Sequence, residues 1–91
     1  MSIIEHYRSE DGGYLFTFKF VQRGGHLDIY CLVHPPLNGR DPDPHKTHLF
    51  SDGQVCIASG MEPRSQGRAE ELAKMWAEYF LQYRGSGIAQ Y

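Results

Sequence analysis

The sequence predicts an α+β domain: an antiparallel β-meander of about four strands with one long C-terminal helix packed on one face. Two observations favour this fold class. The first third of the chain alternates apolar and polar residues in segments separated by Gly-rich turns, which is typical of strands joined by hairpins. The last third carries a single apolar stripe at spacings of three and four residues, which is typical of a helix with one buried side.

The three N-terminal strands are expected over residues 2–9, 14–22 and 26–33. The turns between them, at 11–13 and 23–25, contain paired glycines, which accept the left-handed dihedral angles of tight hairpins. The second strand has the clearest pattern, because its aromatic residues fall on one face and predict the core side of the sheet. These residues are Tyr14, Phe16, Phe18 and Phe20.

Strand 26–33 is expected to end before Pro35 and Pro36, because successive prolines cannot donate the hydrogen bonds of a sheet. The loop from there to Pro44 is long for so small a domain, and we interpret it as a wall or lid for the segment that follows. Cys31 alternates in phase with the apolar residues of its strand, so it is predicted to be a core thiol.

A reactive site is predicted in the segment 44–60, which holds two histidines and a cysteine. Its runs 49–50 and 54–58 are expected to pair as a small hairpin across Ser51-Asp52-Gly53, where Gly accepts a positive φ. An irregular loop leading into the helix is the alternative. In a strand, Cys56 points away from the apolar side chains of this segment, so its thiol is predicted to be reachable.

The helix is predicted to begin near Ser65, which suits an N-cap, and to end at Arg84 and Gly85. Its apolar stripe runs along about four turns and should lie across the aromatic face of the sheet. The stripe consists of Ala69, Leu72, Ala73, Trp76, Tyr79, Phe80 and Tyr83. Residues 84–91 are interpreted as a flexible tail of a single small domain that spans residues 1–91.

Composition excludes several classes of function. The formal charge of −2 with interspersed signs offers no basic surface for phosphates, so nucleic acid is not an expected partner. No apolar run approaches the roughly twenty residues of a membrane-spanning helix, and the first residues lack the pattern of a secretion signal. We therefore expect no membrane partner and a cytoplasmic location, where the two cysteines are reduced. No cofactor is predicted.

A domain of 91 residues covers a sheet poorly, because it buries only about two-thirds of its unfolded surface. The face of the sheet away from the helix is therefore expected to remain partly exposed and apolar. It carries Leu15, Val21, Tyr30 and Leu32. An exposed apolar face of this kind predicts a homodimer or a protein partner.

Three interpretations of the segment 44–60 remain open. In the first, Cys56 is a covalent acyl carrier, and His48 helps as a hydrogen-bond donor or proton carrier. In the second, His45, His48 and Cys56 bind zinc. His34 is then the fourth ligand, although the spacing matches no common zinc pattern. In the third, Cys56 packs as a small hydrophobe and the histidines are solvated loop residues.

The order of residues resembles the ubiquitin-conjugating enzyme family. That family has an antiparallel meander, a proline-rich segment, a His-Pro-Asn stretch, a short turn with Gly, a catalytic Cys and a later helix. The matching stretch here is Lys46-Thr47-His48, then Leu49 to Gly53, then Gln54-Val55-Cys56-Ile57, after Pro35-Pro36. By spacing, Cys56 stands at the family's catalytic Cys, and His48 stands at the Asn that assists the oxyanion.

The resemblance implies that Cys56 receives a ubiquitin-like modifier from an activating enzyme and carries it as a thioester, with His48 assisting. His in place of Asn is similar to the compact bacterial relatives of this fold, which serve ubiquitin-like transfer systems. The sequence departs from the family in its strand-like beginning, where the family has a helix that docks the activating enzyme, and in having no helices after the long one. These departures keep an alternative open, a catalytically inactive protein-binding or dimerising domain of the same α+β fold.

Overall fold

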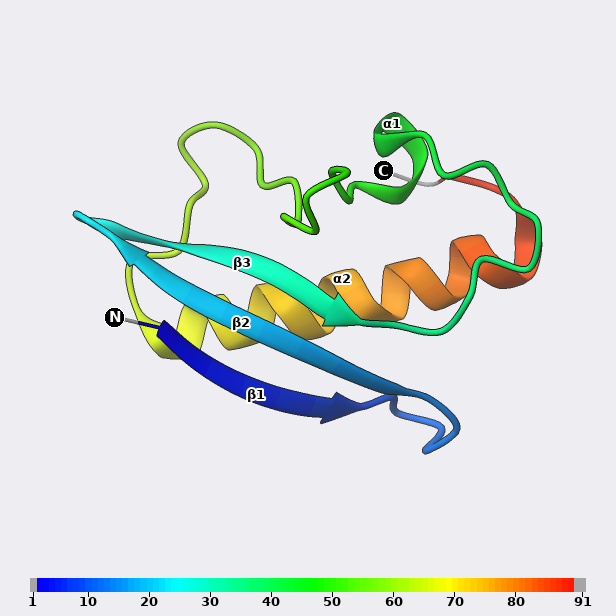
Figure 1. The fold of residues 1–91 in the computed structure, drawn as a ribbon, viewed down its shortest axis with the longest axis horizontal. Coiled ribbons are helices and arrows are strands. Elements are labelled where there is room, and N and C mark those ends of the chain that lie inside the picture. Colours follow the sequence, from blue (N-terminus) through cyan, green and yellow to red (C-terminus); the bar gives the residue numbers. More distant parts are fainter. Residues whose placement is uncertain (1, 90–91) are drawn as a thin grey trace.

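The computed structural model describes residues 2–89. Within them the elements follow in the order β1 (Ser2–Arg8), β2 (Leu15–Arg23), β3 (His26–Val33), α1 (Pro44–Thr47) and α2 (Gln66–Ser86). The strands form one antiparallel sheet in the order β1-β2-β3. In Figure 1, α2 passes behind this sheet, and α1 lies beyond the β3 edge. The α+β class, the antiparallel meander and the C-terminal helix are confirmed.

The core lies between β2 and α2. Phe20 of β2 lies opposite Ile29 of β3 in the sheet register, and both are buried. Trp76 packs edge-to-face against Phe16 and Phe18, with ring centroids 6.1 and 6.0 Å apart. The predicted contact between the aromatic row and the helix stripe is therefore confirmed. The buried residues of α2 are Ala69, Ala73, Trp76, Ala77, Phe80 and Tyr83, with Leu72 and Tyr79 half-buried beside them.

The described residues form three strands, whereas about four were predicted. The segment after α1 does run along β3, where the Val55 N–H donates to the Ile29 carbonyl at 2.8 Å and the Leu27 N–H donates to the Pro63 carbonyl at 2.9 Å. Residues 56–62 leave the sheet edge between these two bonds, so a continuous fourth strand is not formed. Isolated bridges join Tyr30 to Gln54 and Leu49 to Val55.

α2 begins where the sequence predicts and ends later. Ser65 is its N-cap, and the Ser65 side-chain oxygen accepts the Arg68 N–H at 3.2 Å. The helix continues through Ser86 and ends at Gly87, which has a φ of 75° and donates its N–H to the Tyr83 carbonyl. The first residues of the segment predicted as a tail are thus helical, and residues 90–91 lie outside the described chain.

The proline-containing loop is fastened to α2. We call residues 36–47 the strap. Side chains of α2 donate hydrogen bonds to backbone carbonyls of the strap: Trp76 to Thr47, Tyr79 to Lys46, Tyr83 to Asp41 and Arg84 to Pro36. Arg40 of the strap donates in return to the carbonyls of Arg84 and Gly85, at 3.1 and 2.8 Å. Irregular backbone needs such partners, so the row of donors fixes the chain that leads into the candidate site.

Candidate functional site

A tight turn brings the two candidate catalytic residues to opposite sides of a small hairpin. The Phe50 N–H donates to the Gln54 carbonyl, and the Cys56 N–H donates to the His48 carbonyl, both at 2.8 Å. Gly53 closes the turn with a φ of 91°. The predicted pairing therefore forms over a short length, and it sets the backbone of Cys56 against that of His48.

The turn itself is docked on the sheet. The Cys31 N–H donates to the Gly53 carbonyl at 2.8 Å. A Cβ atom at position 53 would lie 3.2 Å from the Cys31 carbonyl oxygen, so glycine suits both the dihedral angle and the close approach. Asp52 supports the turn by accepting the Gln54 N–H at 2.9 Å. The position of the hairpin is thereby tied to β3.

The two cysteines have different surroundings. Cys31 is buried, its Sγ–H donates to the Val33 carbonyl at 3.3 Å, and burial raises the pKa of its thiol to about 12. The prediction of a core thiol is confirmed. Cys56 is half-buried and stands where the chain leaves the sheet edge. Because the thiolate is the nucleophilic form, the raised pKa makes Cys31 unreactive at neutral pH, whereas Cys56 differs from it in being only half-buried.

His48 ends α1 in a left-handed conformation, with φ 54° and ψ 34°. Its ring lies edge-to-face with the ring of Tyr79, with centroids 5.6 Å apart. Burial, and secondarily the nearby His45, lower the pKa of His48 below its ordinary value of 6.5. The neutral form of the imidazole therefore predominates at pH 7, and a neutral imidazole has one N–H donor and one acceptor nitrogen.

The sequence analysis did not predict α1, the turn of helix that carries the chain into His48. Asp43 is its N-cap and accepts the His45 N–H at 2.9 Å, and Pro44 occupies the first helical position. A capping residue followed by proline is a recognised helix start. That signal is present at residues 43–44 and identifies the helix in retrospect.

The histidines considered as zinc ligands are not gathered into a metal centre. Within residues 2–89, no group of three or more His, Cys, Asp or Glu side chains is arranged to hold a metal ion. His34 instead packs on Phe80, with ring centroids 4.9 Å apart, and its Nδ1 lies 2.7 Å from the Pro35 carbonyl oxygen. The zinc interpretation therefore receives no support from the arrangement of these residues.

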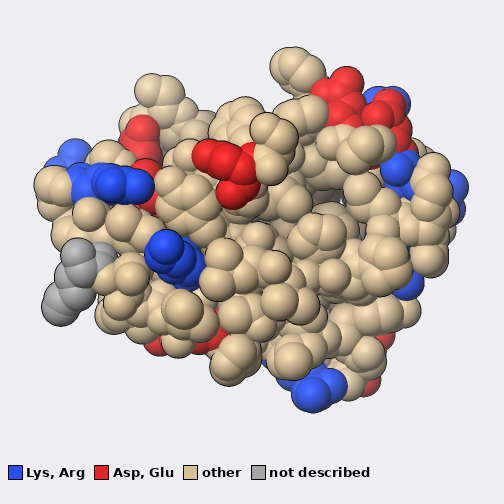
Figure 2. All heavy atoms as spheres, viewed as in Figure 1, with Lys and Arg blue, Asp and Glu red and all other residues tan. Residues whose placement is uncertain are grey.

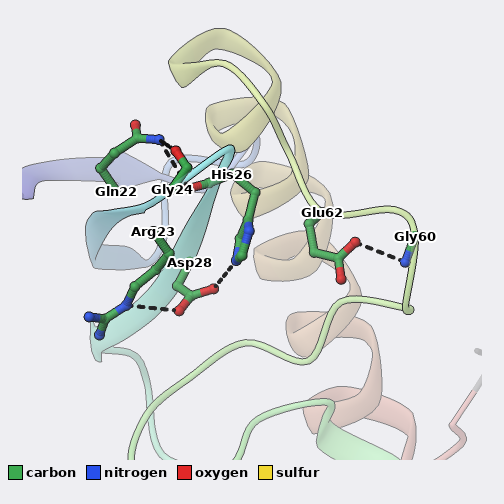
Figure 3. A network of polar contacts seen from close by, with 7 residues as sticks. All are labelled: Gln22, Arg23, Gly24, His26, Asp28, Gly60 and Glu62. Atoms are coloured by element: carbon green, nitrogen blue, oxygen red, sulfur yellow. Dashed lines mark hydrogen bonds and ion pairs between the residues drawn. The ribbon is translucent and has the colours of Figure 1, made fainter.

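A second polar cluster lies at the β2–β3 hairpin. Asp28 contacts the Arg23 side chain at 3.2 Å and the His26 ring at 3.1 Å. Figure 3 shows these side chains converging on the hairpin, with Glu62 bonded to Gly60 in the neighbouring loop. Neither a cysteine nor a serine takes part in the network drawn there. We interpret the cluster as a set of contacts that stabilises the hairpin. The sequence analysis predicted the hairpin but not this cluster.

Comparisons with models of protein families, with curated proteins and with solved structures found no match to this chain. Across residues 2–89, no helix combines the length and the apolar character that crossing a membrane requires. The resemblance to ubiquitin-conjugating enzymes therefore stays a prediction that rests on the sequence of residues 46–57. The backbone pairing of His48 with Cys56 is a separate observation from the structure.

Proposed function

We propose that this protein is a reduced ubiquitin-conjugating-enzyme-like domain that carries a ubiquitin-like modifier as a thioester on Cys56 and transfers it to an amine. The observation that supports the proposal is the small hairpin, which pairs the half-buried Cys56 with His48 through a 2.8 Å backbone hydrogen bond. The other cysteine, Cys31, is buried in the core and keeps its proton at neutral pH.

The chemistry is two successive acyl transfers. In the first, the Cys56 thiolate attacks the carbonyl carbon of a thioester on the activating enzyme. A new C–S bond forms to Cys56, and the thiolate of the activating enzyme leaves. In the second, an amine attacks the Cys56 thioester, the C–S bond breaks, and an amide forms while the amine loses a proton.

His48 has a role in both transfers. Each passes through a tetrahedral intermediate whose negative charge sits on the former carbonyl oxygen, and the N–H of a neutral imidazole stabilises such charge by hydrogen bonding. In the other tautomer the same ring nitrogen is an acceptor and can take the proton that the attacking amine loses, so the buried Nε2 need not face the substrate. The lowered pKa of His48 favours both uses, because it keeps the ring neutral at pH 7.

The proposal is tested with a small acyl donor, the phenyl thioester of N-acetylglycine, at neutral pH. We expect one acetylglycyl group on Cys56, located by peptide mass mapping and released by hydroxylamine. Cys56→Ser should form no hydroxylamine-labile adduct, whereas the matched Cys31→Ala variant should form it as the parent does. Acylation of Cys56 no faster than that of free cysteine in solution would contradict the proposal.

A second candidate function is a protein-binding or dimerising domain, and the exposed face of the sheet favours it. Leu15 and Leu32, on the side away from α2, are 44% and 50% exposed. Figure 2 shows mainly uncharged surface on this side, with charged side chains in small scattered groups. Sedimentation of the parent beside a Leu15→Glu, Leu32→Glu variant tests the dimer, because only the parent should associate. A monomeric parent at high concentration excludes it.

A further inference from the structure

We infer that Tyr79 is a positioning residue for His48 in the proposed acyl transfer, a role that rests on that function. Tyr79 lies on α2, far from His48 and Cys56 in the sequence. Its position in the apolar stripe predicts packing and nothing more. In the structure its ring contacts the His48 ring, and its hydroxyl contacts the backbone that precedes His48.

The first contact is with the His48 ring itself. The two rings lie edge-to-face at an interplanar angle of 67°, with centroids 5.6 Å apart. Such an arrangement places the positive edge of one ring toward the negative face of the other, so it favours one orientation of the imidazole over others. The orientation of His48 decides where its N–H points.

The second contact is with the backbone just before His48. The Tyr79 hydroxyl donates to the Lys46 carbonyl, and the Trp76 Nε1–H donates to the next carbonyl, that of Thr47, at 2.9 Å. α1 is only one turn long and ends at His48 in a left-handed conformation. Two donors from the 21-residue helix α2 therefore hold the last turn before the imidazole.

Tyr79 is thus joined to His48 by its ring and to the preceding backbone by its hydroxyl. Catalytic groups act only when they are held near the productive geometry, and a misplacement of about 1 Å costs on the order of 10²-fold in rate. Tyr79 supplies this restraint through its contacts with the His48 ring and the Lys46 carbonyl. It also contributes to the burial that lowers the pKa of His48.

Three variants separate the two contacts. Tyr79→Phe keeps the ring and removes the hydroxyl donor, and Tyr79→Leu removes both. Tyr83→Phe is the matched control, because Tyr83 makes the same kind of bond to the strap, to the Asp41 carbonyl at 2.7 Å, farther along the chain from His48. Each protein is first checked for its unfolding midpoint and for a native spectrum.

The first readout is the NMR signal of the His48 ring protons, which needs no acyl chemistry. Tyr79→Leu should abolish the ring-current shift that the tyrosine ring imposes and move the His48 titration toward 6.5. Tyr79→Phe should keep most of the ring-current shift, and Tyr83→Phe should leave both quantities at their parent values. Unchanged His48 signals in a folded Tyr79→Leu protein would overturn the inference.

The second readout is the discharge of the acetylglycyl group from Cys56 to free lysine. Tyr79→Leu should slow discharge by roughly 10-fold to 10²-fold, and Tyr79→Phe by less. In a His48→Ala background, Tyr79→Leu should add no further slowing, because its effect passes through His48. Full additivity of the two changes would overturn the inference. If Cys56 forms no adduct, the proposed function fails, and the NMR readout still decides whether Tyr79 orients His48.

Discussion

At the level of single residues, the position of Cys56 and the protonation of His48 depend on the surrounding residues. Backbone pairing sets Cys56 against His48, and burial keeps the imidazole neutral. Replacing His48 by Ala removes both the donor and the acceptor. We expect discharge of a Cys56 thioester to slow by roughly 10²-fold, the scale for losing one oxyanion donor or one general acid or base.

The control for that change is His48→Asn. It restores the residue that the resemblance to ubiquitin-conjugating enzymes implies and keeps a hydrogen-bond donor, so it should retain more activity than His48→Ala. Discharge rates of the acetylglycyl adduct measure the difference. Equal rates for the parent and both variants would remove His48 from the mechanism.

The pKa of His48 gives a prediction for the dependence on pH. Burial lowers this pKa below 6.5, so the neutral ring predominates at pH 7 and above and is lost as the pH falls through the folded value. The ratio of the parent discharge rate to that of His48→Asn should therefore be nearly constant above pH 7 and change mainly as the pH falls below 6.5. Taking the ratio cancels titration of the attacking amine. A ratio that still changes between pH 7 and 8 would contradict the assignment.

The sequence predicts some of these residue environments and misses others. Alternation along β3 is sufficient to place Cys31 in the core, because a strand has only two faces. The role of Tyr79 is not predicted, because a helical stripe indicates which side is buried but not which distant carbonyl a hydroxyl reaches. That pairing depends on the path of the strap, which contains no periodic pattern.

Among the elements, α2 joins the sheet to the strap, and Trp76 contributes to both contacts. It is 3% exposed, packs on the aromatic row of β2, and donates to the Thr47 carbonyl. Trp76→Ala should cost roughly 3 to 5 kcal/mol of unfolding free energy, because it leaves a large cavity. Urea denaturation measures the loss. A variant as stable as the parent would show that α2 does not hold the core together.

The turn that carries Cys56 gives a second test at this scale. Gly53→Ala forces a φ of about +91° on alanine and brings its Cβ within 3.2 Å of the Cys31 carbonyl oxygen. Gly60→Ala is the matched control, with φ +87° and nothing within 4 Å of the new Cβ. The control should cost about 1 to 2 kcal/mol from the dihedral angle alone. Gly53→Ala should cost more in urea denaturation, and equal losses would show that the turn is not pressed against β3.

The sequence predicts an element correctly where its pattern is long and incorrectly where its pattern is short. The stripe of α2 and the aromatic row of β2 each repeat several times, so the local signal determines the structure. The fourth strand depends on a few residues on either side of Gly53. There, the Val55 N–H donates to β3 and the Gly53 carbonyl accepts a hydrogen bond from β3. The chain then leaves the sheet edge over residues 56–62. Packing against the rest of the fold decides the conformation of such short segments, and a single sequence does not reveal that packing.

For the whole molecule, a contact between β1 and α2 joins residues that are 71 positions apart in the sequence. The Tyr7 hydroxyl donates to the Glu78 carboxylate at 2.6 Å. Burial is the larger cause, and the hydrogen bond to Glu78 the next, of a rise in the pKa of Tyr7 from its ordinary value of 10.0 to about 12. The folded protein therefore keeps this proton where the unfolded chain loses it. The stabilisation is present below pH 10 and is lost as the pH rises toward 12.

Tyr7→Phe tests this linkage. The variant lacks the titrating hydroxyl, so its unfolding free energy should fall less steeply than that of the parent between pH 10 and 12. The other tyrosines remain in both proteins and cancel in the comparison. Parallel stability curves over this range would show that Tyr7 does not join β1 to α2 in solution.

The path of residues 53–63 also has a consequence for association. Gly53, Val55 and Pro63 make backbone hydrogen bonds to Cys31, Ile29 and Leu27, so they take up hydrogen-bonding groups on the outer edge of β3. β1 is the opposite edge, and within residues 2–89 no strand pairs with its far side. Of the two edge strands, β1 is therefore the more open to an added strand from another chain. Charged side chains on an edge strand disfavour such pairing, and β1 carries Glu5 and Arg8.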